Sequence, residues 1–551
     1  MRLKTYAWLT AFFAVLSLQA QTNVSIKPIS LRQCVQLALE NNFDIAIARY
    51  RPQIRAYRLG GAYGYYDPEF RVSALHSFEA AEGEFDPATG IQSPAGTGRE
   101  ADIVDGELQG RLWPTGLRYS IGADYRHRYG TTERNVVTID ERGGPTTVIP
   151  GFLPFDQYST AFNISLEQPL LRDFWIDAGR LEFKLRRKDL RISEYELLFA
   201  VQDTVRDVEQ TYYRLIAALD RVRTWEKSVD IAQKFLGDIR SRIDAGVLAT
   251  LDDKSAEGEI GLRQSALLDA RRDVATEENR LKDLISSQSQ QWYNIHLVPQ
   301  ERLLAVAQRY DLQESWLSAL NSRPDFNRLK EELERQGLVV KYDFNQLFPY
   351  LNLIGTYGRR GFDELAYRKD VDNNVILNTS HGVTTNDITT LVKARDATYT
   401  RALHDVGDET NPRYSYGFVV RFPLSFRAER ANYKGSKAEE AELTTRVQQK
   451  QQQIMIGIDD VIQGAKLEFD RVQTARKARE AYEVALGAEQ QKLDNGRSSP
   501  FTVLRMQRDL RAAQLEEILA LQEYNVALAE LQFREGKILA NKGVNVEIIN
   551  K

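Results

Sequence analysis

The chain has 551 residues, of which 27% are charged, a formal net charge of −4 and one cysteine, Cys34. A mildly acidic chain argues against a nucleic-acid partner, and one cysteine excludes an internal disulfide. We therefore expect a fold that is stabilised by packing and assembly.

The first twenty residues have the pattern of an export signal. Arg2 and Lys4 precede an apolar run from Ala7 to Leu18, and the small residue Ala20 follows. A basic region, a short apolar region and a small residue at the cleavage site predict a secretory signal peptide over residues 1–20. No later segment has 18 consecutive apolar residues, so a membrane could be crossed only by β-strands that close into a barrel.

Several short segments alternate between apolar and polar residues. The clearest are Leu117–Tyr129 and Tyr414–Phe422, followed by Ala161–Glu167, and then by the weaker Phe70–Phe78 and Tyr350–Tyr357. Such alternation predicts strands with one apolar face, and their many tyrosines suit a membrane barrel with a wet lumen. A half-exposed sheet of a soluble protein would alternate in the same way.

Two long regions have helical periodicity. The first extends from about Ala178 to Asp244, and the second from about Asn432 to Asp494. At 1.5 Å per residue they predict helices of roughly 100 Å and roughly 95 Å, lengths that are typical of coiled coils or helical tubes. The first region contains a heptad-like seam made of Val201, Val205, Val208, Tyr212, Leu215 and Leu219.

Four prolines separate the predicted helices from the predicted strands. Pro68 and Pro349 each end a helical pattern before a strand, and Pro169 and Pro423 each end a strand before a helix. Proline has no N–H for a ladder or a helix interior, so these positions are junctions.

The two halves of the chain repeat this order. Leu31, Ala38, Leu39, Asp44 and Pro68 match Leu312, Ala319, Leu320, Asp325 and Pro349 at one offset of 281. Near the end of each long helix, "IDAG" returns as "LDNG", with Gly246 and Gly496 suited to the left-handed residue after a helix. We predict an internal duplication with repeats over residues 21–300 and 301–551, and with these glycines at the tips of two helical hairpins.

The ordered set of these segments resembles the TolC-like outer membrane factor family. The resemblance covers nearly the whole mature chain and is carried by "SLRQCVQLALENNFDI", "DPEF", "SLEQPLLRD", "RIDAGVLATLDD", "DLQESWLSALNSRPDF" and "KLDNGRSSPFTVLRMQRDL". It implies a mainly α fold and a homotrimer. The long hairpins would pool into an α-barrel in the periplasm, and the strands would pool into a 12-stranded barrel in outer-membrane lipid.

The sequence departs from the family pattern between Pro68 and Pro169. An extra strand pair, Glu107–Trp113 and Leu117–Tyr129, is joined by the turn sequence "PTG" at residues 114–116. Two added strands preserve the up–down order, so the pair could enlarge the barrel or form an extracellular hairpin.

A second departure concerns the hairpin tips. Family members often narrow the tube there with acidic residues, and Asp252 and Asp253 follow the first Gly turn. At the corresponding positions of the second half, Thr502 and Arg505 stand where carboxylates are expected. A ring of carboxylates would favour cations, so this chain is expected to have an aperture of different charge that opens by helix movement. Surface salt bridges at the tips are the alternative role for these residues.

No catalytic motif or cofactor site is found. The five histidines have no second His or Cys at ligand spacing, and the sequence contains neither a phosphate-binding Gly loop nor a G-x-S-x-G elbow. We therefore expect no enzyme, metal or cofactor. The expected function is an outer-membrane exit channel of a Gram-negative bacterium, supplied by a periplasmic adaptor and an inner-membrane transporter in efflux or type I secretion. The alternative is a soluble periplasmic coiled-coil adaptor, which usually has a single hairpin.

Overall fold

The computed structural model describes residues 25–81, 85–86, 91–92, 97–138, 147–245, 250–367, 393–408 and 411–543. The predicted signal peptide lies outside these residues. The chain divides into two compact units, each of which takes residues from both halves of the sequence. The helical unit lies within 1–55, 190–332 and 444–551, and the sheet unit lies within 56–189 and 333–443.

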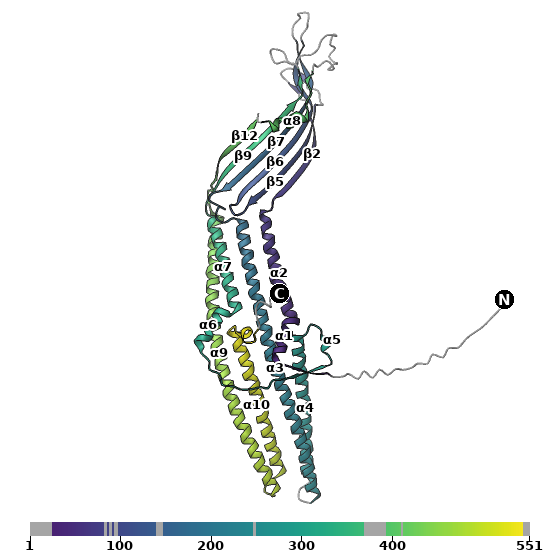
Figure 1. Ribbon diagram of the computed structural model, residues 1–551, viewed down its shortest axis with the longest axis vertical. Helices are drawn as coiled ribbons and strands as arrows, with labels where there is room; N and C mark the ends of the chain where they lie inside the picture. Colours follow the sequence, from purple (N-terminus) through teal and green to yellow (C-terminus); the bar gives the residue numbers. More distant parts are fainter. Residues whose placement is uncertain are drawn as a thin grey trace, which may run out of the picture. The chain divides into compact units, whose positions relative to one another are not determined.

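Two helical hairpins dominate the helical unit. Helix α3 (Ala178–Asp244) runs beside α4 (Thr250–Ile285), and α9 (Arg427–Asp494) runs beside α10 (Pro500–Arg534) (Figure 1). The structure confirms both long helices, and the predicted seam on α3 is buried from Val201 to Leu215. None of the described helices is both long and apolar enough to cross a membrane.

The larger core of the helical unit joins distant parts of the chain. Side chains from α1 (Leu31–Asn41) and α2 (Phe43–Ala62) pack with α3, α4 and the C-terminal α11 (Ile538–Asn541). Beside them, β1 (Ser25–Ile29) pairs in parallel with β8 (Ile295–Pro299). Neither strand is predicted from the sequence, because five residues are too few to establish alternation.

A second core lies around α6 (Leu312–Ser322) and α7 (Pro324–Asn345), which pack against α9. Both short helices that begin the two halves are capped. Ser30 forms a capping box with Gln33 at the start of α1, and Asp311 accepts hydrogen bonds from two backbone N–H groups at the start of α6. Side-chain caps satisfy N–H groups that a helix leaves unpaired at its start.

The sheet unit contains one six-stranded antiparallel sheet with the order β12-β9-β7-β6-β5-β2 (Figure 1). Its strands are β2 (Glu69–Ala81), β5 (Thr97–Leu112), β6 (Leu117–Thr138), β7 (Thr147–Pro169), β9 (Tyr350–Glu364) and β12 (Pro412–Arg421). Every strand segment that the sequence predicts lies in this sheet. The smaller elements of the chain are η1 (Tyr63–Tyr66), β3 (Phe85–Asp86), β4 (Ile91–Gln92), α5 (Ser289–Trp292), β10 (Ala366–Tyr367), β11 (Lys393–Arg395) and α8 (Tyr399–Gly407).

The two faces of the sheet differ in polarity. Because side chains alternate along a strand, the register of the strands places Phe70, Leu108, Ile121, Ile164, Tyr357 and Tyr414 in one row on one face. The neighbouring row lies on the opposite face and consists of Glu69, Gln109, Ser120, Ser165, Thr356 and Ser415. We call these the apolar face and the polar face. The apolar character belongs to the rows near the start of β2, because further along the strands the same face carries His76, Asp102 and His127 in one row.

The proline junctions lie at one end of the strands. Unlike the prediction, the helices after Pro169 and Pro423 do not begin directly at the prolines. Pro68 and Pro349 directly precede β2 and β9, and Pro169 is the last residue of β7. Eight residues, however, separate the end of β7 from the start of α3, and three residues separate Pro423 from the start of α9.

A turn that the sequence does not reveal causes the delay before α3. Asp173 in this connection has a φ of +65°. Arg180 donates hydrogen bonds to the carbonyl oxygens of Asp173 and Pro114, at 2.7 and 2.8 Å. The buried guanidinium therefore holds this connection against the turn between β5 and β6.

Candidate functional site

The tip of the second hairpin is a well-defined turn. Gly496 follows α9 with a φ of +67°, and its N–H donates to the carbonyl of Leu493 at 3.0 Å. The N–H of Arg497 donates to the carbonyl of Lys492 at 2.7 Å. These two bonds form a Schellman motif, which closes a helix with a left-handed residue. Ser499 then caps α10, and Pro500 occupies its first position.

The first tip is only partly within the described residues. Gly246 and the side chain of Asp252 lie outside the described part of the chain. The Asp253 side chain on α4 accepts a hydrogen bond from Nε of Arg240 on α3, at 2.9 Å. Asp253 therefore stabilises its own hairpin through an ion pair.

One arginine links the two tips. Arg242, near the end of α3, donates from Nη1 to the carbonyl of Leu493 at 3.2 Å and from Nη2 to Asp494 Oδ1 at 2.6 Å. Both acceptors belong to the last turn of α9. The end of α3 and the end of α9 are thus held together by one guanidinium group, which the sequence did not single out.

Thr502 and Arg505 have different environments in the first turns of α10. The Thr502 N–H donates to Ser499 Oγ at 3.3 Å, so this residue completes the helix cap. Arg505 is exposed. Hydrogen bonds from Ser498 and Lys492 hold the pKa of Glu489 below its usual value, and the charge of Arg505 acts in the same direction. This tip therefore presents the exposed guanidinium of Arg505, and the expected difference from the family pattern stays a prediction.

Away from the tips, a buried polar cluster connects the two hairpins. The Arg263 side chain on α4 is 1% exposed, and it donates to Glu259 at 3.0 Å, to the carbonyl of Ser228 at 2.9 Å and to Gln507 at 3.1 Å. Ser228 lies on α3 and Gln507 on α10, so one guanidinium bonds three helices. We call Arg263, Glu259, Arg508 and Arg511 the arginine cluster.

The arginine cluster has three cations around one carboxylate. Arg508 and Arg511 of α10 lie 3.1 and 3.5 Å from the carboxylate oxygens of Glu259. Burial acts to raise the pKa of Glu259, but hydrogen bonds from Arg263 and Arg508, with their charges, outweigh burial and hold this pKa below its usual value. Sequence reasoning missed the cluster, because a Glu and an Arg four residues apart on a helix ordinarily form a solvated pair.

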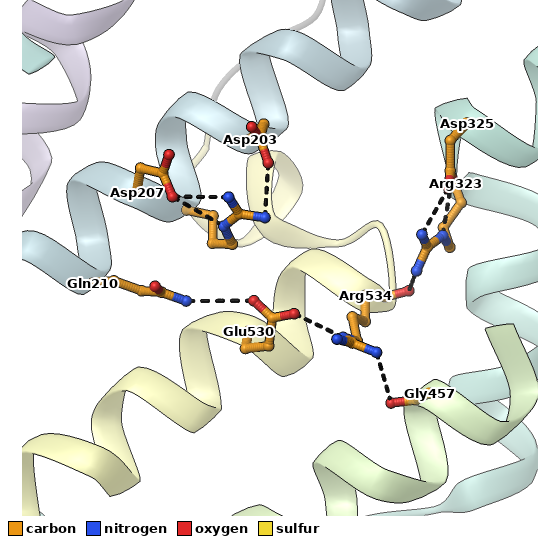
Figure 2. A network of polar contacts seen from close by, with 9 residues as sticks. Asp203, Asp207, Gln210, Arg323, Asp325, Gly457, Glu530 and Arg534 are labelled. Carbon is orange, nitrogen blue, oxygen red and sulfur yellow. Dashed lines mark hydrogen bonds and ion pairs between the residues drawn. The ribbon is translucent and has the colours of Figure 1, made fainter. Parts of the chain in front are cut away.

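A third network ties the end of α10 to neighbouring helices (Figure 2). Arg534 donates to Glu530 at 2.7 Å and to the carbonyl of Gly457 on α9 at 3.3 Å. Its own carbonyl accepts a hydrogen bond from Arg323 at 3.3 Å, and Arg323 holds Asp325 in a bidentate pair at 2.8 and 3.0 Å. These contacts fix the connection between α6 and α7 to both helices of the second hairpin.

Within the described ranges, no group of His, Cys, Asp and Glu side chains could hold a metal ion. The arrangement consists of helical hairpins that are fixed by polar networks, together with a sheet that has one apolar and one polar face. These features agree with the outer-membrane channel that the sequence predicts.

Comparison with known proteins agrees with this class. Residues 154–287 match the family model of the outer membrane efflux proteins. The match confirms the predicted resemblance to the TolC-like outer membrane factors, which are transport channels rather than enzymes. No curated protein matches the chain.

Solved structures show the same fold over nearly the whole chain. The CmeC outer membrane channel of Campylobacter jejuni is 16% identical with a TM-score of 0.58, and the match covers 95% of this chain and 89% of CmeC. The outer membrane protein VceC of Vibrio cholerae is 14% identical with a TM-score of 0.58, covering 92% and 96%. The MtrE outer membrane channel of Neisseria gonorrhoeae, in its open state, is 12% identical with a TM-score of 0.57, covering 92% and 89%.

Proposed function

We propose that the chain is the outer-membrane exit channel of a tripartite efflux or type I secretion system. The observation that carries the proposal is the sheet with one apolar and one polar face, joined in one chain to long helical hairpins. Residues 154–287 of this chain match the efflux family model. The apolar face would contact lipid and the polar face would line a wet lumen. A soluble adaptor is not favoured by these comparisons.

The proposed assembly is a homotrimer. A single copy has a sheet with two open edges, and unpaired strand edges are not tolerated in lipid. Pooling the sheets of several copies removes the edges, and pooling the hairpins closes an α-barrel in the periplasm. The number three comes from the family resemblance. A periplasmic adaptor and an inner-membrane transporter are the proposed partners, and they would supply the cargo.

The proposed origin of the chain is a duplication of one half-motif. Helices α1 and α6 begin at Leu31 and Leu312, and both span eleven residues, at the offset that the sequence pattern predicts. At the same offset, buried Ala38 corresponds to buried Ala319, and buried Ile45 to buried Phe326. These equivalences support repeats over residues 21–300 and 301–551.

The hairpin tips are the proposed aperture. Gly246 and Gly496 would form the two turns, and Asp252, Asp253, Thr502 and Arg505 would set the charge near the opening. The Arg242–Asp494 contact supports a closed arrangement in which the two hairpins of one copy are held together. An inner-membrane partner that docks at the tips would open the aperture by moving the helices.

Planar-bilayer recording of the detergent-purified protein tests the proposed function. The expected result is discrete ion conductance, together with intracellular accumulation of toxic compounds or loss of exported polypeptides in a deletion strain. Recovery of the protein as a monomer in the soluble periplasmic fraction would support the adaptor instead. Recordings of Asp252→Asn and Arg505→Ala test the aperture. Unchanged conductance and ion selectivity in both variants would remove these two residues from it.

A further inference from the structure

We propose that the transmembrane barrel of this channel, here called the wall, contains all six strands of each copy. In this wall, β12 of one copy pairs antiparallel with β2 of the next copy. Three copies then form an eighteen-stranded wall, half as large again as the twelve strands that the resemblance implies. This inference rests on the proposed function, and it specifies how copies of the chain meet in the membrane.

The first argument is the place of the extra pair. Strands β5 and β6 pair with each other in one continuous register, from Arg99 opposite Gly130 to Leu112 opposite Leu117. On one side β5 pairs with β2 over 13 residues, and on the other β6 pairs with β7 over 21 residues. The pair therefore lies in the plane of the sheet between β2 and β7. Its removal from the wall would break both ladders.

The second argument is the state of the two outer strands. The sheet is antiparallel throughout and has six strands, so β2 and β12 run in opposite directions. They can therefore pair with each other between copies. Among the large apolar side chains of the sheet whose burial the structure describes, those on the apolar face of β2 and β12 are the most exposed, with Tyr416 83% and Phe70 69% exposed. Closure within one copy is excluded, because the smallest outer-membrane barrels have about eight strands.

The third argument is a slant at the helix side of the sheet, the end where β2 begins and β12 ends. The ladder row that starts at Glu69, the first residue of β2, reaches Ser415 on β12. Strand β12 continues beyond that row to Arg421, six residues further.

The offset between the ends of β2 and β12 corresponds to a tilt of the strands. Six residues at about 3.3 Å each, over five strand spacings of about 4.8 Å, correspond to a slope of about 40°. If the helix-side ends of the strands lie at one depth, this slope is the tilt of the strands. Membrane barrels have strand tilts of about 35–45°. The six strands thus already have the stagger that a closed wall requires.

The same slope predicts the register between copies. One more strand spacing places Glu69 of the next copy beside residues 421–423 of β12 and the loop that follows it. Glu69 and Ser415 both belong to the polar face, and a shift of one residue would turn a strand over, so only positions two residues apart are allowed. The partner of Glu69 is therefore either Arg421 or Pro423.

Paired cysteines test this contact between copies. Under the two allowed registers, Ser73 of one copy faces Gly417 or Val419 of the next, and all three positions lie on the polar face. The one native cysteine, Cys34, is buried, so introduced cysteines can be oxidised in the native chain with single-cysteine variants as controls. We expect Ser73→Cys to form disulfide-linked dimers and trimers in membranes when combined with Gly417→Cys or with Val419→Cys. The pair Ser77→Cys and Val419→Cys is the matched control, because its partners are about four or more residues out of register and should not link.

Two further pairs test the place of β5 and β6. The structure sets Ser73 opposite Asp105 and Ser120 opposite Ser165. Cysteines at each of these two pairs should link within one chain of the assembled channel, as read by mass spectrometry of the linked peptides. If the extra pair instead stood outside the wall, β2 would lie beside β7, and the same slope would let Ser73→Cys link to Asn163→Cys or to Ser165→Cys.

The outcomes separate this inference from the proposed function. Linkage of Ser73 to Asp105 and of Ser120 to Ser165, with eighteen strands counted in an electron cryo-microscopy map, supports the wider wall. Linkage of Ser73 to Asn163 or to Ser165, or a count of twelve strands in a conducting trimer, overturns the inference and leaves the channel intact. A protein that neither conducts ions nor assembles in membranes overturns the proposed function itself.

Discussion

Arg263 donates a hydrogen bond from Nε to Oε1 of Glu259 across 3.0 Å, and both side chains are almost completely buried. Glu259 also faces Arg508 and Arg511. It is the only carboxylate among the four charged groups of the arginine cluster. The two hairpins are therefore joined by a carboxylate that compensates several cations.

We expect Glu259→Gln to destabilise the helical unit by about 3–5 kcal/mol, because the variant leaves buried guanidinium groups without their counter-charge. Denaturant unfolding of the detergent-purified protein, followed by far-UV circular dichroism, measures this loss. The control is Arg508→Gln, whose side chain is 60% exposed and should cost less than about 1 kcal/mol. Equal losses in the two variants would contradict the role given to Glu259.

Asp325 should make stability depend on pH in the acid range. Burial acts to raise the pKa of Asp325, but hydrogen bonds and charges from Arg323 and Lys450 outweigh burial and lower it to about 2. A lowered pKa stabilises the fold above the unfolded-state value of about 3.9, and this stabilisation is lost as the pH falls towards about 2. The wild type should therefore lose stability between about pH 4 and pH 2, whereas Asp325→Asn should change less. If the unfolding midpoints of the wild type and of Asp325→Asn fell by the same amount over this pH range, ionisation of Asp325 would not be the cause of the loss.

The link between the hairpin tips should restrain the aperture. Arg242→Ala removes the hydrogen bonds to Leu493 and Asp494, so we expect a higher single-channel conductance or open probability. Lys234→Ala is the control, because Lys234 is exposed on the same helix and pairs only with Asp230 of its own helix among the contacts described. An unchanged Arg242→Ala channel would show that this contact does not restrain opening.

We expect Gly496 to be required because of its backbone conformation, and not because a side chain at this position would collide with neighbouring atoms. A Cβ at this position would meet no atom within 4 Å, but the φ of +67° is costly for other residues. We expect Gly496→Ala to destabilise the protein by about 1 kcal/mol. Gly487→Ala, in the body of α9 and equally unobstructed, should stabilise by about 0.5–1 kcal/mol. The two variants should thus shift the thermal midpoint in opposite directions.

Local patterns in the sequence predicted the regular elements well. The helical periodicity from about Ala178 to Asp244 predicted α3 with the bounds that the structure has, because a periodic pattern over many turns is a strong signal. The strand segments were predicted because each keeps one apolar face over at least six residues.

Features that depend on distant residues were not predictable in this way. The start of α3 is delayed by a turn that Arg180 holds from a different part of the fold, and no local pattern reports that contact. The arginine cluster joins α3, α4 and α10, and its residues look like ordinary surface charges when each helix is considered alone. The place of β5 and β6 likewise follows only from pairing across the sheet.

The core that joins the two ends of the chain has a consequence for biogenesis. The C-terminal residues Phe533, Ile538 and Leu539 pack in the same core as the N-terminal residues Val35 and Ile45. Because the N-terminal segment leaves the export machinery first, this core can be completed only after the C-terminal segment has left. During that interval the core that α1 and α2 form with α3 and α4 lacks its C-terminal side chains, and periplasmic chaperones and proteases compete for the incomplete core. A chain interrupted shortly before Phe533 would therefore be degraded rather than accumulate as a shortened channel.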